Sequence, residues 1–410
     1  MIRISLDLDT NSFQELQFAY LHCLLLIGAV GIGREDLWQY LSQKSSSVSN
    51  ANVSLADRSN AQAIIRENDP GLYEFLFPDG RLEVQKLVWL LVGIPPDGRE
   101  FLSMRENLED IIREVEAGRN GFVQNKENLN AIKTIFDYSS LSTINKGLSE
   151  ELGGELDTAY WLQHQLKVRT CPYCNANYTR VSFPKAFRAD LEHFFPRSEY
   201  PYLSVSLFNL FPACQTCNKL KSDKANRLGG EEILYPYSES FDENAQERIP
   251  FRFVIDKEAS PVKVLSGISD QFSIRLVPVD DTDCFALDAA MTLDGVAERR
   301  KKKEKTAPYW DRAIRAIHLF QLDEVYKYHK PEVQKLLRIL YIYNHAAREQ
   351  RSKLLPEKEH YFLQLPPLAD LLFANLEKEH WGDMPLNKLK ADIVEQVTEL
   401  ENQAKIAQEE

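Results

Sequence analysis

Four of the six cysteines in this 410-residue chain form two Cys-x-x-Cys pairs, Cys171-Pro-Tyr-Cys174 and Cys214-Gln-Thr-Cys217. Two such pairs supply four thiolates, which is the ligand set of a tetrahedral zinc site with no open position for substrate. Bringing both pairs to one ion restricts the path of the intervening segment. We therefore expect a structural Zn²⁺ bound by these four cysteines.

Two unrelated redox or buried cysteine pairs are the alternative interpretation. Six cysteines are too few for a disulfide framework in a chain of this length, so metal binding in a reducing compartment is favoured. The segment between the pairs lacks long hydrophobic periods. A structural zinc ion can supply about 10–16 kcal/mol of apparent binding free energy to fold such a unit.

Residues suited to phosphodiester hydrolysis lie between and beside the cysteine pairs. Glu192 and His193 stand in the run LEHFFP, Asn209 precedes the second pair and Asn218 follows it. A histidine can deprotonate water near neutral pH, and a divalent cation can neutralise charge that develops on phosphate. We predict that His193 is the general base and that Asn209 orients its imidazole. Because hard oxygen ligands suit Mg²⁺ or Mn²⁺, we predict that Glu192 and Asn218 bind such a catalytic ion.

The order of these residues resembles the HNH nucleases, whose core is a two-stranded hairpin followed by a helix around one catalytic divalent ion. Glu192 and His193 match the first element, Asn209 the second and Asn218 the third. The phrases CPYC, EHFFPRSEYP, CxxCNxxKSD and ILYPYSE are similar to the HNH subunits of Septu-type and retron-associated anti-phage systems. The resemblance covers roughly residues 168–240.

The resemblance implies a ββα-metal core that hydrolyses DNA rather than RNA and leaves 3′-hydroxyl and 5′-phosphate ends. It also implies a role as an effector of anti-phage defence, with an ATPase sensor encoded nearby as protein partner. The chain itself has no nucleotide-binding loop. The alternative function is a non-catalytic zinc module that binds nucleic acid or a protein partner. In that case His193 and the asparagines serve structure only.

The identity of the carboxylate ligand is open at this stage. Many HNH sequences have Asp directly before the histidine, whereas this chain has Glu192 there and Asp190 two positions earlier. Asp190 could therefore share or take over the role of Glu192. A regular strand would also direct Glu192 and His193 to opposite faces, so both serve one site only if the strand bulges or ends at this point.

Charge is distributed unevenly along the chain. The net charge of −12 argues against a protein that coats nucleic acid over its whole surface. Between residues 167 and 227, however, basic residues outnumber acidic ones, which predicts a local nucleic-acid site. The predicted contacts to nucleic acid are Arg188, Lys219, Lys221 and Lys224.

Hydrophobic periodicity predicts mainly helical regions and a few strands, hence an α+β protein, and the resemblance implies a zinc-stapled, treble-clef-like ββα-metal core between the helical regions. We expect a helical interaction or regulatory region over 1–160, the nuclease core with its four-cysteine zinc site over 161–240, a small β-rich segment over 241–295 and a helical region over 296–410.

Hydrophobic periodicity predicts individual elements in the C-terminal half. Residues 251–255, 262–264 and 272–276 alternate apolar and polar side chains, as half-buried strands do. Apolar residues over 333–341 and 386–400 recur at helical spacing.

The chain lacks an uninterrupted run of about 18 apolar residues, and its start, MIRISLDLDT, lacks a hydrophobic signal core. We therefore expect a cytoplasmic protein that does not enter a membrane.

Overall fold

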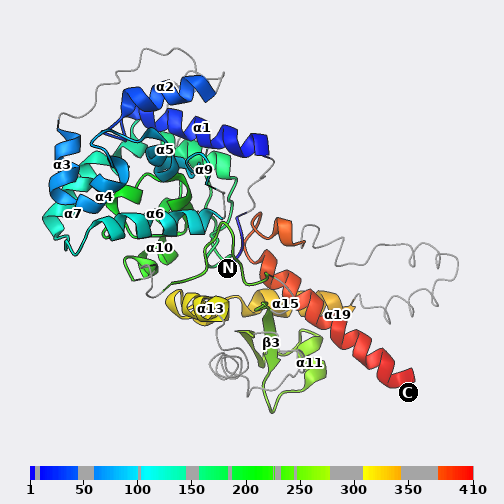
Figure 1. Ribbon diagram of the computed structural model, residues 1–410. Coiled ribbons are helices and arrows are strands. Elements are labelled where there is room, and N and C mark those ends of the chain that lie inside the picture. Colours follow the sequence, from blue (N-terminus) through cyan, green and yellow to red (C-terminus); the bar gives the residue numbers. More distant parts are fainter. Residues whose placement is uncertain are drawn as a thin grey trace. The chain divides into compact units, whose positions relative to one another are not determined.

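The computed structural model describes residues 1–4, 10–44, 60–99, 103–144, 157–182, 187–224, 226, 232–243, 247–277, 308–342 and 377–409. The chain forms two compact units (Figure 1). The larger unit comprises Arg3–Pro172 and Thr179–Ser238, and the smaller unit comprises Met1–Ile2, Tyr173–Tyr178 and Glu239–Glu410.

Helices make up most of the larger unit before its short hairpin. Gly71 of α4 lies so close to α6 that an added Cβ would stand 2.0 Å from the Val115 carbonyl oxygen, which explains the glycine there. Gly93 ends α5 because its left-handed backbone, with φ of 73°, stops the helix. The helices are α1 (Thr10–Ile27), α2 (Arg34–Lys44), α3 (Ala61–Asn68), α4 (Pro70–Leu76), α5 (Val84–Val92), α6 (Met104–Gly118), α7 (Lys126–Ile135), η1 (Tyr138–Ser142) and α9 (Thr158–Leu166).

A β-hairpin followed by a helix completes the larger unit. Strand β1 (Asp190–His193) pairs antiparallel with β2 (Leu210–Ala213), so that Glu192 faces Phe211 and His193 faces Leu210. Two short 3₁₀ helices, η2 (Pro201–Leu203) and η3 (Leu207–Asn209), lie in the connection, and α10 (Gln215–Lys221) follows β2. The β-hairpin is thus followed directly by a helix, in the order β1, β2, α10.

The smaller unit contains a second hairpin, β3 (Phe251–Ile255) with β4 (Phe272–Leu276), as the period of two predicts. The strand expected over 262–264 is wrong, because these residues lie in helix α11. Pro261 occupies its first turn, where a proline needs no hydrogen bond. The unit's helices are α11 (Pro261–Leu265), α13 (Pro308–Leu319), α14 (Leu322–Lys327), α15 (Lys330–Ile342), η5 (Lys378–His380) and α19 (Asn387–Glu409).

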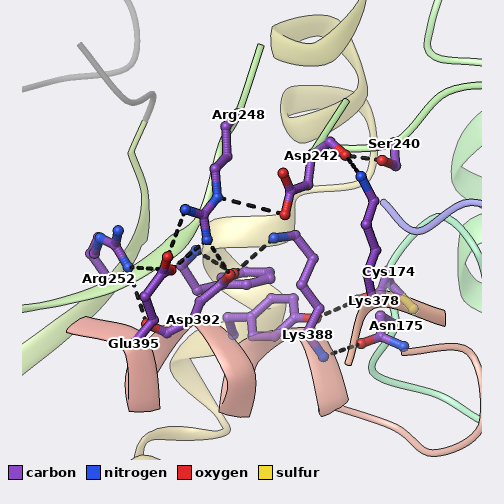
Figure 2. Close-up of polar contacts among 12 residues, drawn as sticks. Cys174, Asn175, Ser240, Asp242, Arg248, Arg252, Lys378, Lys388, Asp392 and Glu395 are labelled. Carbon is purple, nitrogen blue, oxygen red and sulfur yellow. Dashed lines mark hydrogen bonds and ion pairs between the residues drawn. The ribbon is translucent and has the colours of Figure 1, made fainter. Parts of the chain in front are cut away.

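Helix α19 lies along β3 and carries a polar network (Figures 1 and 2). Figure 2 shows Arg248 and Lys388 directed toward Asp392, and Lys388 Nζ lies 2.8 Å from Asp392 Oδ2. The same carboxylate oxygen accepts the backbone N–H of Phe251 at 2.8 Å. Arg248 also donates to Glu395 at 2.7 Å. The helix is thus anchored to the strand through buried charges rather than through apolar contacts alone.

The smaller unit includes part of the β-rich segment expected over 241–295, of which 244–246 and 278–295 lie outside the described residues. Helices α15 and α19 occupy the regions 333–341 and 386–400 where helical spacing predicts them, although α19 begins one residue later, at Asn387. Among the described helices, none is both long and apolar enough to cross a membrane.

Candidate metal centre and polar pocket

The four predicted zinc ligands come together. The Sγ atoms of Cys171, Cys174, Cys214 and Cys217 all lie within 4.8 Å of one another, and all four residues are buried. Four thiolates around zinc at about 2.3 Å stand about 3.8 Å apart, so small adjustments suffice to fit the ion. The donor set and its spacing are consistent with a structural zinc site.

Backbone geometry around the cysteines supports metal binding. The backbone N–H of Ala176 donates to Cys174 Sγ at 3.4 Å, and the amide of Asn177 lies 3.9 Å from the same sulfur. Such donors favour the thiolate form that zinc requires. Cys214 precedes the first residue of α10 and Cys217 lies in its first turn, where the helix dipole favours negative charge.

A polar pocket of about 300 Å³ opens beside the hairpin of the larger unit. It brings together four of the predicted site residues, Asp190, Glu192, His193 and Asn218, from β1 and α10. The other lining residues are Tyr138, Leu191, Pro196, Arg197, Ser222 and Asp223.

The end of β1 explains how neighbouring residues serve one pocket. Asp190 and Glu192 are two positions apart on the strand and therefore share a face. His193 is the last residue of the strand, so its side chain is released from strict alternation and also lines the pocket. The sequence allowed either a bulge or a strand end to bring both side chains to one site, and the structure has a strand end at His193.

The imidazole of His193 is held by one hydrogen bond and one ring contact. Its Nε2 lies 2.9 Å from the carbonyl oxygen of Ser204, and its ring meets the ring of Tyr138 edge to face at 4.6 Å. Because a carbonyl only accepts, Nε2 carries the proton and Nδ1 keeps the lone pair. Burial lowers the pKa of His193 to about 3, so the ring is neutral at pH 7 and Nδ1 carries no proton.

The helices of the larger unit fix the backbone that accepts this hydrogen bond. Ser204 Oγ donates to the Phe136 carbonyl oxygen at 2.6 Å, and Ser206 Oγ donates to the Leu90 carbonyl oxygen at 2.6 Å. Between them, the carbonyl of Val205 accepts from a buried tyrosine hydroxyl of α1 at 3.1 Å. The position of His193 therefore depends on helical segments far upstream in the sequence.

Glu192 forms a buried ion pair with Lys221. The Lys221 ammonium lies 2.5 Å from Glu192 Oε1 and also donates to the His193 carbonyl oxygen at 2.6 Å. Burial raises the pKa of Glu192, and the neighbouring Lys221 opposes that shift. Lys221 is fully buried, so it differs from our expectation of a nucleic-acid contact. Its ammonium instead ties α10 to the end of β1.

Asp190 and Asn218 contact one another at the pocket. Asn218 Nδ2 donates to Asp190 Oδ2 at 3.0 Å, which leaves the amide oxygen of Asn218 as an available ligand type. Asp190 is exposed, whereas Glu192 is buried and paired with Lys221. Asp190 is therefore the carboxylate that solvent and a hydrated cation reach more readily.

Asn209 is fully buried and does not line the pocket. Its side chain accepts the Phe195 N–H at 2.7 Å and donates to the Phe195 carbonyl at 3.1 Å and the Leu203 carbonyl at 3.0 Å. These bonds hold the backbone that follows His193 and the residue before Ser204. The three bonds of the Asn209 side chain all go to backbone atoms, so Asn209 acts on the imidazole through the backbone.

The three remaining basic residues predicted to contact nucleic acid differ in their exposure to solvent. Lys219 and Lys224 are exposed on and after α10. Arg188 is half-buried, donates to Ser142 Oγ at 2.8 Å and lies 3.8 Å from Asp157. Lys219 and Lys224 are free of such anchoring among the described contacts, so they fit the expected role better than Arg188 does.

Sequence reasoning assigned no role to Tyr138, Arg197 and Asp223, which also line the pocket. Arg197 and Asp223 follow His193 and Asn218 closely, so proximity to the motif could have indicated them. Tyr138 precedes the motif by more than fifty positions and reaches the pocket only through tertiary packing. No local pattern marks it.

No family model, curated protein or solved structure matches the chain.

In the part of the chain that the structure describes, no second group of three Cys, His, Asp or Glu side chains gathers as the four cysteines do. A cation in the pocket would thus have few protein ligands and would keep water, as Mg²⁺ commonly does.

Proposed function

We propose that the protein is a metal-dependent endonuclease of the HNH type that hydrolyses phosphodiester bonds. One observation supports this most strongly: a single pocket gathers His193, Asp190 and Glu192 from the end of β1 with Asn218 of the following helix. The ββα order of these elements matches the resemblance seen in the sequence. The cluster of cysteines beside α10 would hold a structural Zn²⁺.

Different residues of the pocket would carry out different parts of the hydrolysis. A bound Mg²⁺ or Mn²⁺ would neutralise charge on the phosphate and on the leaving oxygen. Asp190 and Asn218 would hold that ion, with Glu192 next to them. Nδ1 of His193 takes a proton from water while the water oxygen bonds to phosphorus. The bond from phosphorus to the 3′ oxygen breaks, and that oxygen takes up a proton from solvent, which yields 3′-hydroxyl and 5′-phosphate ends.

The finer assignments rest on resemblance and on local charge. DNA is the proposed substrate in preference to RNA, and exposed Lys219 and Lys224 would contact its backbone. The proposed setting is anti-phage defence, with an ATPase sensor as partner that licenses cleavage. Co-purification from the native operon tests the partner, and full activity of the isolated chain would contradict licensing.

Cleavage of plasmid DNA with Mg²⁺ or Mn²⁺ tests the catalytic assignment. The wild-type protein, with neighbouring gene products added where required, should convert supercoiled plasmid to nicked and linear forms. His193→Ala should lower the rate by about 10²–10⁴-fold, the usual contribution of a general base. Asp190→Asn should raise the metal concentration needed for half-maximal rate.

The matched control is His164→Ala, a histidine on exposed α9 surface of the same unit. It should cleave at the wild-type rate. Cleavage undiminished in His193→Ala would refute the assignment, provided that both variants retain zinc and wild-type thermal stability.

A non-catalytic zinc module remains the second candidate, and one observation favours it. The carboxylate of Glu192 is already paired with Lys221, which is what a purely structural residue would do. The two functions give opposite results in one experiment. A non-catalytic module binds nucleic acid but leaves it intact at any concentration of Mg²⁺ or Mn²⁺.

A further inference from the structure

Arg197 is a charged residue of the pocket to which the proposed chemistry gives no role. Its side chain is exposed and lines the pocket, and its guanidinium lies 5.2 Å from the centre of the Tyr138 ring. Within the described part of the chain, no carboxylate forms a salt bridge with Arg197. An arginine over an aromatic face keeps its planar set of donors available, because the stacking uses its face and not its N–H groups.

Tyr138 fixes the position of this arginine and of the catalytic histidine together. Its hydroxyl donates to the Leu191 carbonyl oxygen of β1 at 3.1 Å, while its ring contacts the imidazole of His193 on one side. Arg197 lies over the same ring. A single aromatic side chain therefore sets the spacing between the guanidinium and the imidazole.

Side chains of both charges line the pocket. Asp190 and Asp223 supply carboxylates, which attract a cation, whereas Arg197 supplies the guanidinium. A phosphate bound next to a divalent cation needs this arrangement, because its oxygens face the cation on one side and can accept N–H bonds on the other. Arginine matches phosphate geometry through two parallel N–H bonds.

We propose that Arg197, positioned by the ring of Tyr138, binds a phosphate group of the nucleic-acid substrate at the rim of the pocket. The inference rests on the proposed function and adds a residue and a contact to it. Arg197 contacts substrate, whereas Tyr138 is a positioning residue. The phosphate bound by Arg197 lies next to His193, so the contact places the scissile bond and not a remote part of the duplex.

Binding of a fluorescein-labelled DNA duplex, measured with Ca²⁺ in a His193→Ala background, tests the contact without cleavage. Adding Arg197→Gln should weaken binding by about tenfold at low salt, because a charge-assisted phosphate contact is lost. The slope of log affinity against log salt should fall by about 0.9, the value for one phosphate contact on duplex DNA. Tyr138→Leu should weaken binding in the same direction, and Tyr138→Phe should bind better than Tyr138→Leu.

Arg66→Gln is the matched control, because Arg66 also lies over a tyrosine ring, at 4.5 Å from its centre, in the same unit but outside the pocket. It should leave affinity and salt slope unchanged. An Arg197→Gln variant with the salt slope of Arg66→Gln would overturn the inference, as would absence of DNA binding by the parent protein.

The same variants separate this inference from the proposed function. Arg197-dependent binding by a wild-type chain that never cleaves DNA would support the phosphate contact and refute the nuclease. Cleavage by wild type together with an unchanged salt slope in Arg197→Gln would support the nuclease and refute the contact.

Discussion

Lys221 holds together the two elements that carry the candidate site. Its ammonium contacts Glu192 and the carbonyl of His193, so one buried charge connects α10 to the end of β1. A buried ammonium with a carboxylate partner and a carbonyl acceptor is well compensated, whereas either charge alone would be costly. The pair therefore stabilises the geometry of His193 whether or not Glu192 also contacts a metal ion.

We predict that Lys221→Met destabilises the protein by about 3–5 kcal/mol, because it leaves the Glu192 carboxylate buried without its partner. Adding Glu192→Leu should restore most of that loss, since the double variant buries neither charge. Urea denaturation of the wild type, both single variants and the double variant measures the coupling. Additive losses in the double variant would show that the two side chains do not interact.

The sequence predicted the candidate site where its residues are close along the chain. Asp190, Glu192 and His193 share one strand, and Asn218 follows the second strand, so a ββα order is enough to bring them together. Tyr138 was not predictable, because its place beside His193 depends on how η1 packs against the hairpin. The burial of Lys221 was equally unpredictable, because the sequence of a short helical motif does not distinguish an exposed lysine from a buried one.

At the scale of elements, side chains of α19 form hydrogen bonds with backbone groups of β3 that face away from β4. Alternate residues of a strand direct their backbone groups to the side away from the partner strand, and these groups need bonds when buried. Asp392 accepts the Phe251 N–H, while Gln396 accepts the Phe253 N–H at 3.0 Å and donates to its carbonyl at 3.1 Å. Two side chains one helical turn apart thus satisfy the backbone hydrogen-bonding groups at two positions of the strand.

Replacing Gln396 with Leu should destabilise the smaller unit by about 2–4 kcal/mol. The change removes both bonds of Phe253 and leaves two buried backbone groups unsatisfied, at about 1–3 kcal/mol each before relaxation. Gln403→Leu, at an exposed position of the same helix, is the control and should have little effect. Hydrogen exchange at the Phe253 amide measures the loss directly, and unchanged protection there would contradict the account.

The ion pair of Glu395 with Arg248 should make the stability of this unit depend on pH. Burial raises the pKa of Glu395, but the hydrogen bond and charge of Arg248 outweigh it, so the net pKa lies below its usual value of 4.5. A carboxyl whose pKa is lower in the folded state stabilises the fold above the unfolded pKa and loses that effect as the pH falls through the folded pKa.

Wild type should therefore melt at a higher temperature than Glu395→Gln at pH 7, and the difference should shrink as the pH falls below 4.5. Thermal unfolding of both proteins across this range measures the difference. A gap that is constant with pH would exclude a contribution from the charge of Glu395.

Short elements show where sequence patterns fail to determine structure. Residues 262–264 alternate as a strand would, yet they form α11, because three residues cannot distinguish a period of two from one turn of helix. Longer patterns succeeded: five alternating residues in β3 and in β4, and the extended apolar stripes of α15 and α19. Pro261 at the start of α11 is a helix-start signal that alternation alone does not take into account.

At the scale of the whole molecule, the four-cysteine cluster joins parts of the chain that are distant in sequence. An ion bound by all four cysteines would hold the ends of the segment between Cys174 and Cys214 together in the folded state, and α10 begins directly at the second cysteine pair. The helix that carries Asn218 and Lys221 is only seven residues long, so its own backbone bonds stabilise it poorly. Zinc binding would supply that stability.

We predict that the purified protein contains one zinc ion per chain and that Cys174→Ser lowers both zinc content and melting temperature. The expected loss is several kcal/mol, because structural zinc contributes about 10–16 kcal/mol of apparent binding free energy in small zinc units. Cys23→Ala provides the control: Cys23 is buried in α1, outside the cluster, so its replacement should leave zinc content at one ion per chain. Elemental analysis and thermal unfolding measure both effects. A Cys174→Ser protein that retains full zinc, or that is zinc-free yet as stable as wild type, would contradict the structural role of the ion.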